Sequence, residues 1–152
     1  MTVPTDSGLD IVNLTWAALQ IVKDGVPVHG ADAIGLALHS NGHLGADLLR
    51  VPPGTSFPIH THPGDHLLLC LEGSGTITIG ERTHRVHPGD FYMVNGQTPH
   101  AVGAGLDAHH VLIAIGAPHK PVDSPERMQF TDWTGKILDQ PLFHTDESGV
   151  VQ

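Results

Sequence analysis

The middle of the chain alternates short apolar runs with turn residues, a pattern typical of proteins built from many short strands. Residues 33–39 and 43–51 form two such runs, and the Asn-Gly pair between them is a strong hairpin signal. Further runs at regular spacing predict strands over residues 75–79, 82–86, 91–94, 108–115 and the leucine-rich stretch 67–71. We therefore expect an all-β fold, either a barrel or a double-sheet jelly roll.

The two ends of the chain do not share this alternation. Residues 1–10 are polar, and residues 11–22 are apolar without a clean period, which fits a strand, a short helix or an arm on a partner subunit. Residues 126–138 fit a short helix or an irregular cover, and residues 144–152 a frayed tail. We expect a single domain over residues 1–152, divided into an N-terminal arm (1–32), a barrel core (about 33–117) and a C-terminal cover and tail (118–152).

Composition argues against several classes of function. The net charge of −9, with only 7 Lys and Arg residues, would repel the phosphates of a nucleic acid. No apolar run approaches membrane-spanning length, and the polar start MTVPTDSGLD does not resemble a signal peptide. A single cysteine, Cys70, excludes an internal disulfide and is compatible with a reducing compartment. We expect a cytoplasmic protein that binds neither nucleic acid nor membrane.

Three histidines stand close together after the predicted hairpin. His60 and His62 are one residue apart, so in an extended chain their side chains lie on the same face. His66 keeps the same parity beyond a Pro-Gly-Asp turn, which would bring the chain back onto an adjacent strand. Three imidazoles could therefore converge on one point. Because the chain has 13 histidines in 152 residues, this spacing alone would arise by chance in roughly one such sequence in ten.

A glycine stands on each side of the three histidines and makes the spacing more specific. Together these residues resemble the first motif of the cupins, G-x5-H-x-H-x3-E-x6-G. Its positions are filled in order by Gly54, His60, His62, His66 and Gly73. The second cupin motif, a Pro-Gly-Asp strand that leads to a turn and a histidine, resembles residues 88–100 with His100 at the end. The resemblance implies a double-stranded β-helix of the jelly-roll type. It also implies a metal ion held by four ligands, His60, His62, His66 and His100.

One position departs from the family pattern. Where most cupins carry a glutamate ligand, this chain has His66, and Glu72 lies too far along the strand to replace it. Neutral imidazoles suit zinc, iron, nickel or copper. Four histidines without a carboxylate would leave the charge of the ion uncompensated, which makes it a stronger Lewis acid and favours an anionic ligand such as an enolate or a β-dicarbonyl. Four ligands on an octahedral ion leave two open positions, and a chelating β-dicarbonyl would fill both and exclude O2. The pattern therefore favours redox-neutral chemistry.

Among the cupins, a small single-domain chain with this fourth histidine resembles the cyclases of bacterial aromatic polyketide pathways, the resistomycin-type cyclases. The resemblance implies a homodimeric zinc enzyme of antibiotic biosynthesis, with Fe²⁺ or Ni²⁺ as alternative ions, that directs aldol-type ring closure and aromatisation of a poly-β-keto chain. Its general acid or base would be a metal-bound hydroxide or whichever of His109 and His110 faces the cavity. Two alternatives stay open: an iron-dependent dioxygenase of a β-dicarbonyl or thiol, and a cupin that is a non-catalytic or sugar-binding protein or an isomerase.

Other residues near the motif have more than one interpretation. Leu67, Leu69 and Leu71 face away from His66 and need a cover, either within the chain or from a second subunit. Asp47 and Arg50 lie on the strand before the motif and fit either the pocket wall or a surface ion pair. Cys70 shares the parity of the histidines, and a small buried apolar residue is the simpler interpretation.

Overall fold

The computed structural model describes residues 3–4, 9–80 and 82–144 of the chain. One helix, α1, spans Leu14–Asp24. The strands are β1 (Val3–Pro4), β2 (Asp10–Ile11), β3 (Val26–Pro27), β4 (Ile34–Ser40), β5 (Gly45–Val51), β6 (His60–Thr61), β7 (His66–Glu72), β8 (Gly75–Ile79), β9 (Arg82–Val86), β10 (Phe91–Val94), β11 (His100–Ala104), β12 (His110–Gly116) and β13 (Gln129–Phe130). Every strand predicted from the apolar runs is present, with ends displaced by no more than one or two residues.

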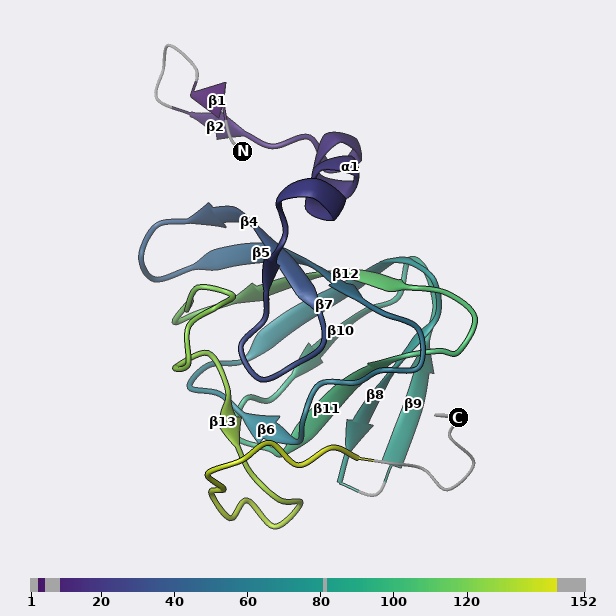
Figure 1. Ribbon diagram of the computed structural model, residues 1–152. Coiled ribbons are helices and arrows are strands. Elements are labelled where there is room, and N and C mark those ends of the chain that lie inside the picture. The colour runs from purple at the N-terminus through teal and green to yellow at the C-terminus, as the bar shows by residue number, and fades with distance from the viewer. Residues whose placement is uncertain (1–2, 5–8, 81, 145–152) are drawn as a thin grey trace.

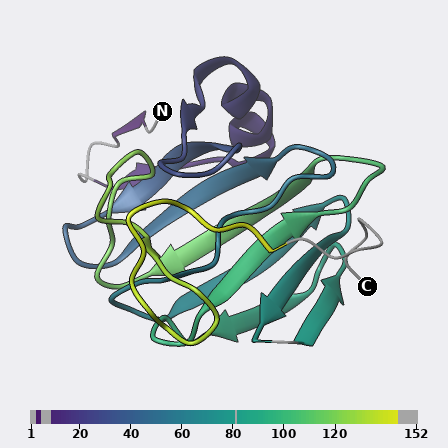
Figure 2. The ribbon, with the colours of Figure 1, turned by 60° about the horizontal axis from the view of Figure 1, so that its bottom comes forward.

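Two antiparallel sheets face each other and enclose the core (Figures 1 and 2). The first has the strand order β10-β7-β12-β5-β4-β3, and the second has the order β13-β6-β11-β8-β9. The main apolar cluster lies between them, where Leu49, Leu68 and Leu112 of the first sheet meet Ile77 and Val102 of the second. This arrangement confirms the predicted jelly roll.

The hairpin between β4 and β5 forms at the predicted Asn-Gly pair. The side-chain oxygen of Asn41 accepts hydrogen bonds from the backbone N–H groups of His43 and Leu44, at 2.9 and 2.8 Å. Gly42 has φ of +89°, a conformation that glycine adopts without a steric penalty. These local preferences fix the register of β5, the strand that carries Asp47 and Leu49 to the inner face.

Helix α1 lies largely in the apolar segment at residues 11–22, for which the sequence allowed a strand, a short helix or an arm on a partner subunit. Asn13 caps it by accepting a hydrogen bond from the backbone N–H of Trp16 at 3.1 Å. Ala17 and Ile21 are buried against the outer face of the first sheet, where they meet Leu48 and Ile113. Figure 1 shows the helix lying over the side of that sheet formed by β4 and β5.

The apolar outer face continues beyond the helix. Leu69 and Leu71 of β7 pack partly against the helix-side cluster, so a cover within the chain accounts for part of the leucine-rich strand. The neighbouring edge strand β10 exposes Phe91 and Met93, by 59% and 64%. These two pair directly with Leu69 and Leu67 of β7, so they extend the same outward face.

The C-terminal part after residue 117 crosses the open end of the two sheets (Figure 2). Of the two structures that its sequence allowed, the irregular cover is the one observed, with β13 as a two-residue strand that pairs with β6. The expected tail at residues 144–152 falls, except for His144, outside the described residues. In the polar start, β1 pairs with β2, and the other residues before Leu9 lie outside the described part. No helix within the described part is long and apolar enough to cross a membrane.

Gly73, the second glycine of the first motif, lies in the turn after β7, and its substitution tests the close packing of this turn. Gly73 has φ of +65°, and a Cβ atom there would lie 2.1 Å from the backbone oxygen of His109. We expect Gly73→Ala to lower the free energy of unfolding by about 2–3 kcal/mol or more, because the substitution combines backbone strain with a clash. The matched control is Gly42→Ala, where φ is +89° and nothing lies within 4 Å, so only about 1 kcal/mol of strain is expected. Urea unfolding of both variants measures the difference, and equal losses would contradict the close approach.

Candidate metal centre

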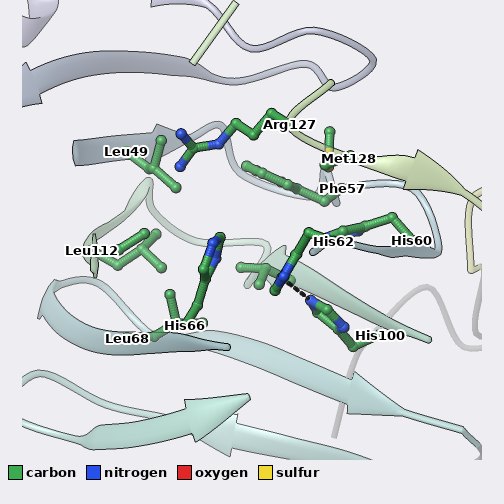
Figure 3. A pocket seen from close by; sticks show the side chains of 12 residues that line it. Leu49, Phe57, His60, His62, His66, Leu68, His100, Leu112, Arg127 and Met128 are labelled. Carbon is green, nitrogen blue, oxygen red and sulfur yellow. Dashed lines mark hydrogen bonds between the residues drawn. The ribbon is translucent and has the colours of Figure 1, made fainter. Parts of the chain in front are cut away.

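Three histidines from two neighbouring strands of the second sheet meet at one end of the core (Figure 3). His60 begins β6, His62 follows it, and His100 begins β11 directly opposite His60 in the antiparallel register. All three side chains are buried. One ring nitrogen from each can be chosen so that all lie within 4.8 Å of one another, a group that could hold a metal ion.

Backbone carbonyls hold each ring in one orientation. The Nδ1 atoms of His60, His62 and His100 lie 2.7, 2.5 and 2.7 Å from the carbonyl oxygens of Pro58, Gly64 and Thr98. A carbonyl can only accept, so each Nδ1 carries the proton and donates it. Each Nε2 is then left with an unprotonated lone pair, the form in which imidazole binds a metal.

The remaining geometry fits a cation. The Nε2 atoms of His62 and His100 are 3.0 Å apart. With both Nδ1 atoms protonated, no proton lies between these two lone pairs, so a positive ion is what relieves their repulsion. Two nitrogens at the usual distance of about 2.0–2.1 Å from a divalent ion, at right angles to each other, would stand about 3 Å apart. The three histidines therefore fit the metal site of a cupin, while their chemistry does not select one metal.

Burial keeps the three rings neutral. It is the main cause that lowers the pKa of His100 to about 4, with a further contribution from the nearby His62. Burial, followed by the neighbouring His100, holds the pKa of His60 well below its usual value. Burial also lowers the pKa of His62, against the opposing effect of its bond to Gly64. Neutral imidazoles are ready to bind an ion without first losing a proton.

His66 lies beside this group but is not part of it. Its ring is stacked on that of His62, with centroids 3.8 Å apart and planes at 16°. Two parallel rings cannot both point an in-plane lone pair at the same ion, so His66 is not a ligand together with His62 in this conformation. The His66 ring packs against β12, because a Cβ atom added to Gly116 would lie 2.3 Å from Cδ2 of His66. Burial, followed by the charges of His62 and Arg127, lowers the pKa of His66 to about 2. Of the four predicted ligands the structure groups three, and the role of His66 as a fourth stays a prediction.

The two candidate acid–base residues do not line the histidine cavity. His110 begins β12 and faces the interior, but only Leu112 and Ala114 further along this strand reach the cavity wall. Its Nδ1 atom instead lies 3.6 Å from the sulfur of Cys70. His109 precedes the strand and is half-buried. The structure thus gives neither residue a contact with the site. Cys70 is a buried free thiol, 3.2 Å from the carbonyl oxygen of Gly73.

The cavity over the histidines is small and mostly apolar. Its volume is about 30 Å³, and its walls include Leu49, Phe57 and Leu112. A larger groove of about 410 Å³ lies outside it and shares His62 and Met128 with it. The inner cavity is thus large enough for an ion and a few atoms, while the groove could hold a longer molecule.

The C-terminal cover supplies two cavity residues that sequence reasoning missed, Arg127 and Met128. They stand well beyond the second motif and have no spacing that ties them to the histidines. Arg127 is buried and pairs with Asp47 of β5, 2.7 Å away. Asp47 had been a candidate for the pocket wall; it lines a smaller adjoining cavity instead, whereas Arg50 alternates to the outer side of the strand.

Comparison with known proteins identifies the family. The model of the cupin domain matches residues 47–123, which include all three grouped histidines. A curated relative, L-ectoine synthase from Hyphomonas neptunium, is 32% identical over 118 residues, which cover 73% of this chain and 72% of that one. This chain is therefore a member of the cupin family.

Solved structures agree with this assignment at the level of the fold. The polyketide cyclase RemF from Streptomyces resistomycificus aligns with a TM-score of 0.62 and 22% identity, covering 82% of this chain and 87% of RemF. A putative ethanolamine utilization protein Q from Salmonella typhimurium aligns with a TM-score of 0.65 and 13% identity, over 79% of this chain and 94% of that one. The proteins similar to this chain thus include an ectoine synthase and a polyketide cyclase, so the family and the fold are defined while the reaction is not.

Substitution of single histidines tests the three-ligand centre. We expect His100→Ala to lose stoichiometric divalent metal, because it removes one of three converging nitrogens. His66→Phe should retain the metal, because phenylalanine preserves the ring stacked on His62 and offers no ligand atom. Metal content after purification without added metal, and zinc affinity by competition with a chromophoric chelator, measure both. The control for loss of a histidine is His84→Ala, an exposed position on β9. Loss of metal in His66→Phe would instead establish His66 as a ligand.

Proposed function

We propose that this cupin is a metal-dependent cyclase that directs aldol-type ring closure and aromatisation of a poly-β-keto chain, with zinc as the ion. The observation that carries the proposal is the set of three neutral histidines, each fixed by a backbone carbonyl, without a carboxylate among the grouped residues. A bound divalent ion would polarise a substrate carbonyl and stabilise the developing negative charge of an enolate. The similarity of the fold to the polyketide cyclase RemF supports this choice of reaction.

The protein walls would determine which part of the substrate reacts. Because the inner cavity is about 30 Å³, only the reacting carbonyl groups would enter it, and the rest of a long chain would lie in the groove of about 410 Å³. Leu49, Phe57 and Leu112 would exclude water from the reacting end and favour one folded arrangement of a flexible chain.

A second candidate, an iron-dependent dioxygenase of a β-dicarbonyl, is favoured by the position of His66. With His66 stacked on His62, an octahedral ion held by three histidines keeps three open positions, enough for a chelating substrate and O2 together. The expectation that four ligands would exclude O2 therefore depends on His66 turning toward the ion. Metal identity and oxygen consumption separate the two candidates.

Turnover of a linear poly-β-keto compound by the zinc-loaded protein tests the cyclase. We expect a cyclised product that has lost water, identified by mass spectrometry, with no oxygen uptake at a Clark electrode. His62→Ala should lower the rate by at least about a hundredfold, because it removes a ligand nitrogen, and His84→Ala should not change it. Stoichiometric iron in the purified protein, together with oxygen uptake on a β-dicarbonyl, would reject the cyclase and support the dioxygenase.

We also propose that the protein works as a homodimer, with the second copy on the outer face of the first sheet. Helix α1 covers only part of that face, and Phe91 and Met93 continue the outward surface of Leu67 and Leu69. Apolar side chains of this size, grouped at a sheet edge, are typical of interfaces.

Light scattering after size-exclusion chromatography measures the molar mass in solution and so tests whether this dimer forms. We expect a dimer for the wild-type chain and a monomer for the double variant Phe91→Asp/Met93→Asp, because buried charges would oppose association. The matched control is Leu106→Asp, which places the same charge at an exposed leucine of the loop before β12. A wild-type monomer at micromolar concentration would reject the dimer.

A further inference from the structure

Arg127 carries a charge whose burial the metal centre alone does not explain. Its side chain is only 7% exposed, although it lies in the irregular cover just before β13. Nη1 donates one hydrogen bond to Oδ2 of Asp47, at 2.7 Å, and another to the carbonyl oxygen of Lys120, at 2.8 Å. His119 lies 2.8 Å from the same Asp47 oxygen. Burying a guanidinium is costly even when it is paired, so we expect Arg127 to have a role beyond stability.

The position of the guanidinium suggests that role. Arg127 lines the histidine cavity, and it also lines the smaller cavity of about 10 Å³ where Asp47 lies. Asp47 itself does not line the histidine cavity, but it shares the smaller cavity with Arg127, His62 and His66. Figure 3 shows it near Leu49, on the side of the cavity occupied by His66 and away from His100.

The nitrogens of Arg127 are used unequally. Both of its hydrogen bonds to described residues leave from Nη1, which is the side toward Asp47 and Lys120. Nη2 and Nε remain, and together they form the second edge of the guanidinium. Two parallel N–H groups on one edge match the two oxygens of a carboxylate.

The charge of the cavity favours the same kind of ligand. Among the described residues that line it, none is acidic. Arg127 is a permanently charged side chain in this wall, and a divalent ion would add to the positive potential. Asp47 offsets the charge of Arg127, so a neutral substrate would leave the charge of the ion uncompensated, whereas a carboxylate would neutralise part of it.

We propose that Arg127 is a specificity residue that binds a carboxylate of the substrate, and that Asp47 is a positioning residue that holds Arg127 beside the metal centre. The substrate class is then a β-keto acid with a free carboxylate rather than a neutral ester or thioester. This inference deepens the proposed function and rests on it for the metal and the β-keto group.

Binding of a matched pair of small probes tests the proposal without turnover. Acetoacetate is an anion, and acetoacetamide has nearly the same shape without the charge. Isothermal titration of the zinc-loaded wild-type protein should give at least about tenfold tighter binding of acetoacetate, the size expected for a charge-assisted hydrogen bond. No preference for the anion in the wild-type protein would overturn the proposal.

Two variants separate a role in binding from a role in stability. Asp47→Asn/Arg127→Met avoids leaving a buried carboxylate unpaired, and it should weaken acetoacetate about 10- to 100-fold with little change for acetoacetamide. Asp47→Asn alone removes the neutralising charge but keeps an acceptor for Nη1, so acetoacetate should bind more tightly. Both changes remove the ion pair, and so a purely structural role would move both affinities in the same direction, which would overturn the proposal.

A further variant covers the case in which the double substitution does not fold. Arg127→Lys keeps a positive charge opposite Asp47 but loses the planar edge, so it should retain only part of the preference for acetoacetate. A preference equal to that of wild type would overturn the carboxylate assignment. Metal content is measured for every variant, so that loss of the ion is not mistaken for loss of the anion site.

The outcomes also separate this inference from the proposed function. A protein that prefers acetoacetate through Arg127 but forms no cyclised product would retain the anion site and lose the cyclase. A working cyclase with equal affinity for both probes would retain the function and lose the role of Arg127.

Discussion

The candidate metal centre depends on three hydrogen bonds from histidine Nδ1 atoms to backbone carbonyls. Each bond joins a ring to a residue two positions away, Pro58, Gly64 or Thr98 in turn. The site is therefore held by the local backbone as well as by the sheet, and the register of β6 with β11 brings the two local units together. These bonds set the tautomer of each ring without a bound ion. The unprotonated Nε2 atoms therefore already face a common point.

The second constraint comes from the buried ion pair between Arg127 and Asp47. It joins the C-terminal cover, which has little regular structure, to the long central strand β5. The cover is also held by the two-residue strand β13, by backbone hydrogen bonds such as that from His29 to Val122, and by burial of Val122 and Met128 in the main apolar cluster. The hydrogen bond within this pair is directional, so it helps to fix the position of the cover over the histidines.

Local sequence pattern predicted most of the fold and the centre of the site, because both depend on alternation along strands. The parity of His60 and His62 and the hairpin at Gly42 are properties of short segments, and the cupin motif added His100. The orientation of His66 was outside the reach of this reasoning. Its parity correctly predicts that it faces inward, but stacking on His62 and contact with Gly116 of another strand set the direction of its ring. Arg127 was missed for a related reason, since its partner Asp47 is 80 positions earlier in the chain.

The division of the cavity wall between two kinds of structure has an evolutionary consequence. The three rings of the candidate metal centre belong to a barrel whose strands constrain one another through many paired neighbours, so change there is costly. Arg127 and Met128 instead belong to a segment with few backbone partners, over the mouth of the same cavity. New substitutions, insertions or deletions in that segment could redirect this scaffold to other molecules while the three grouped histidines stay as they are.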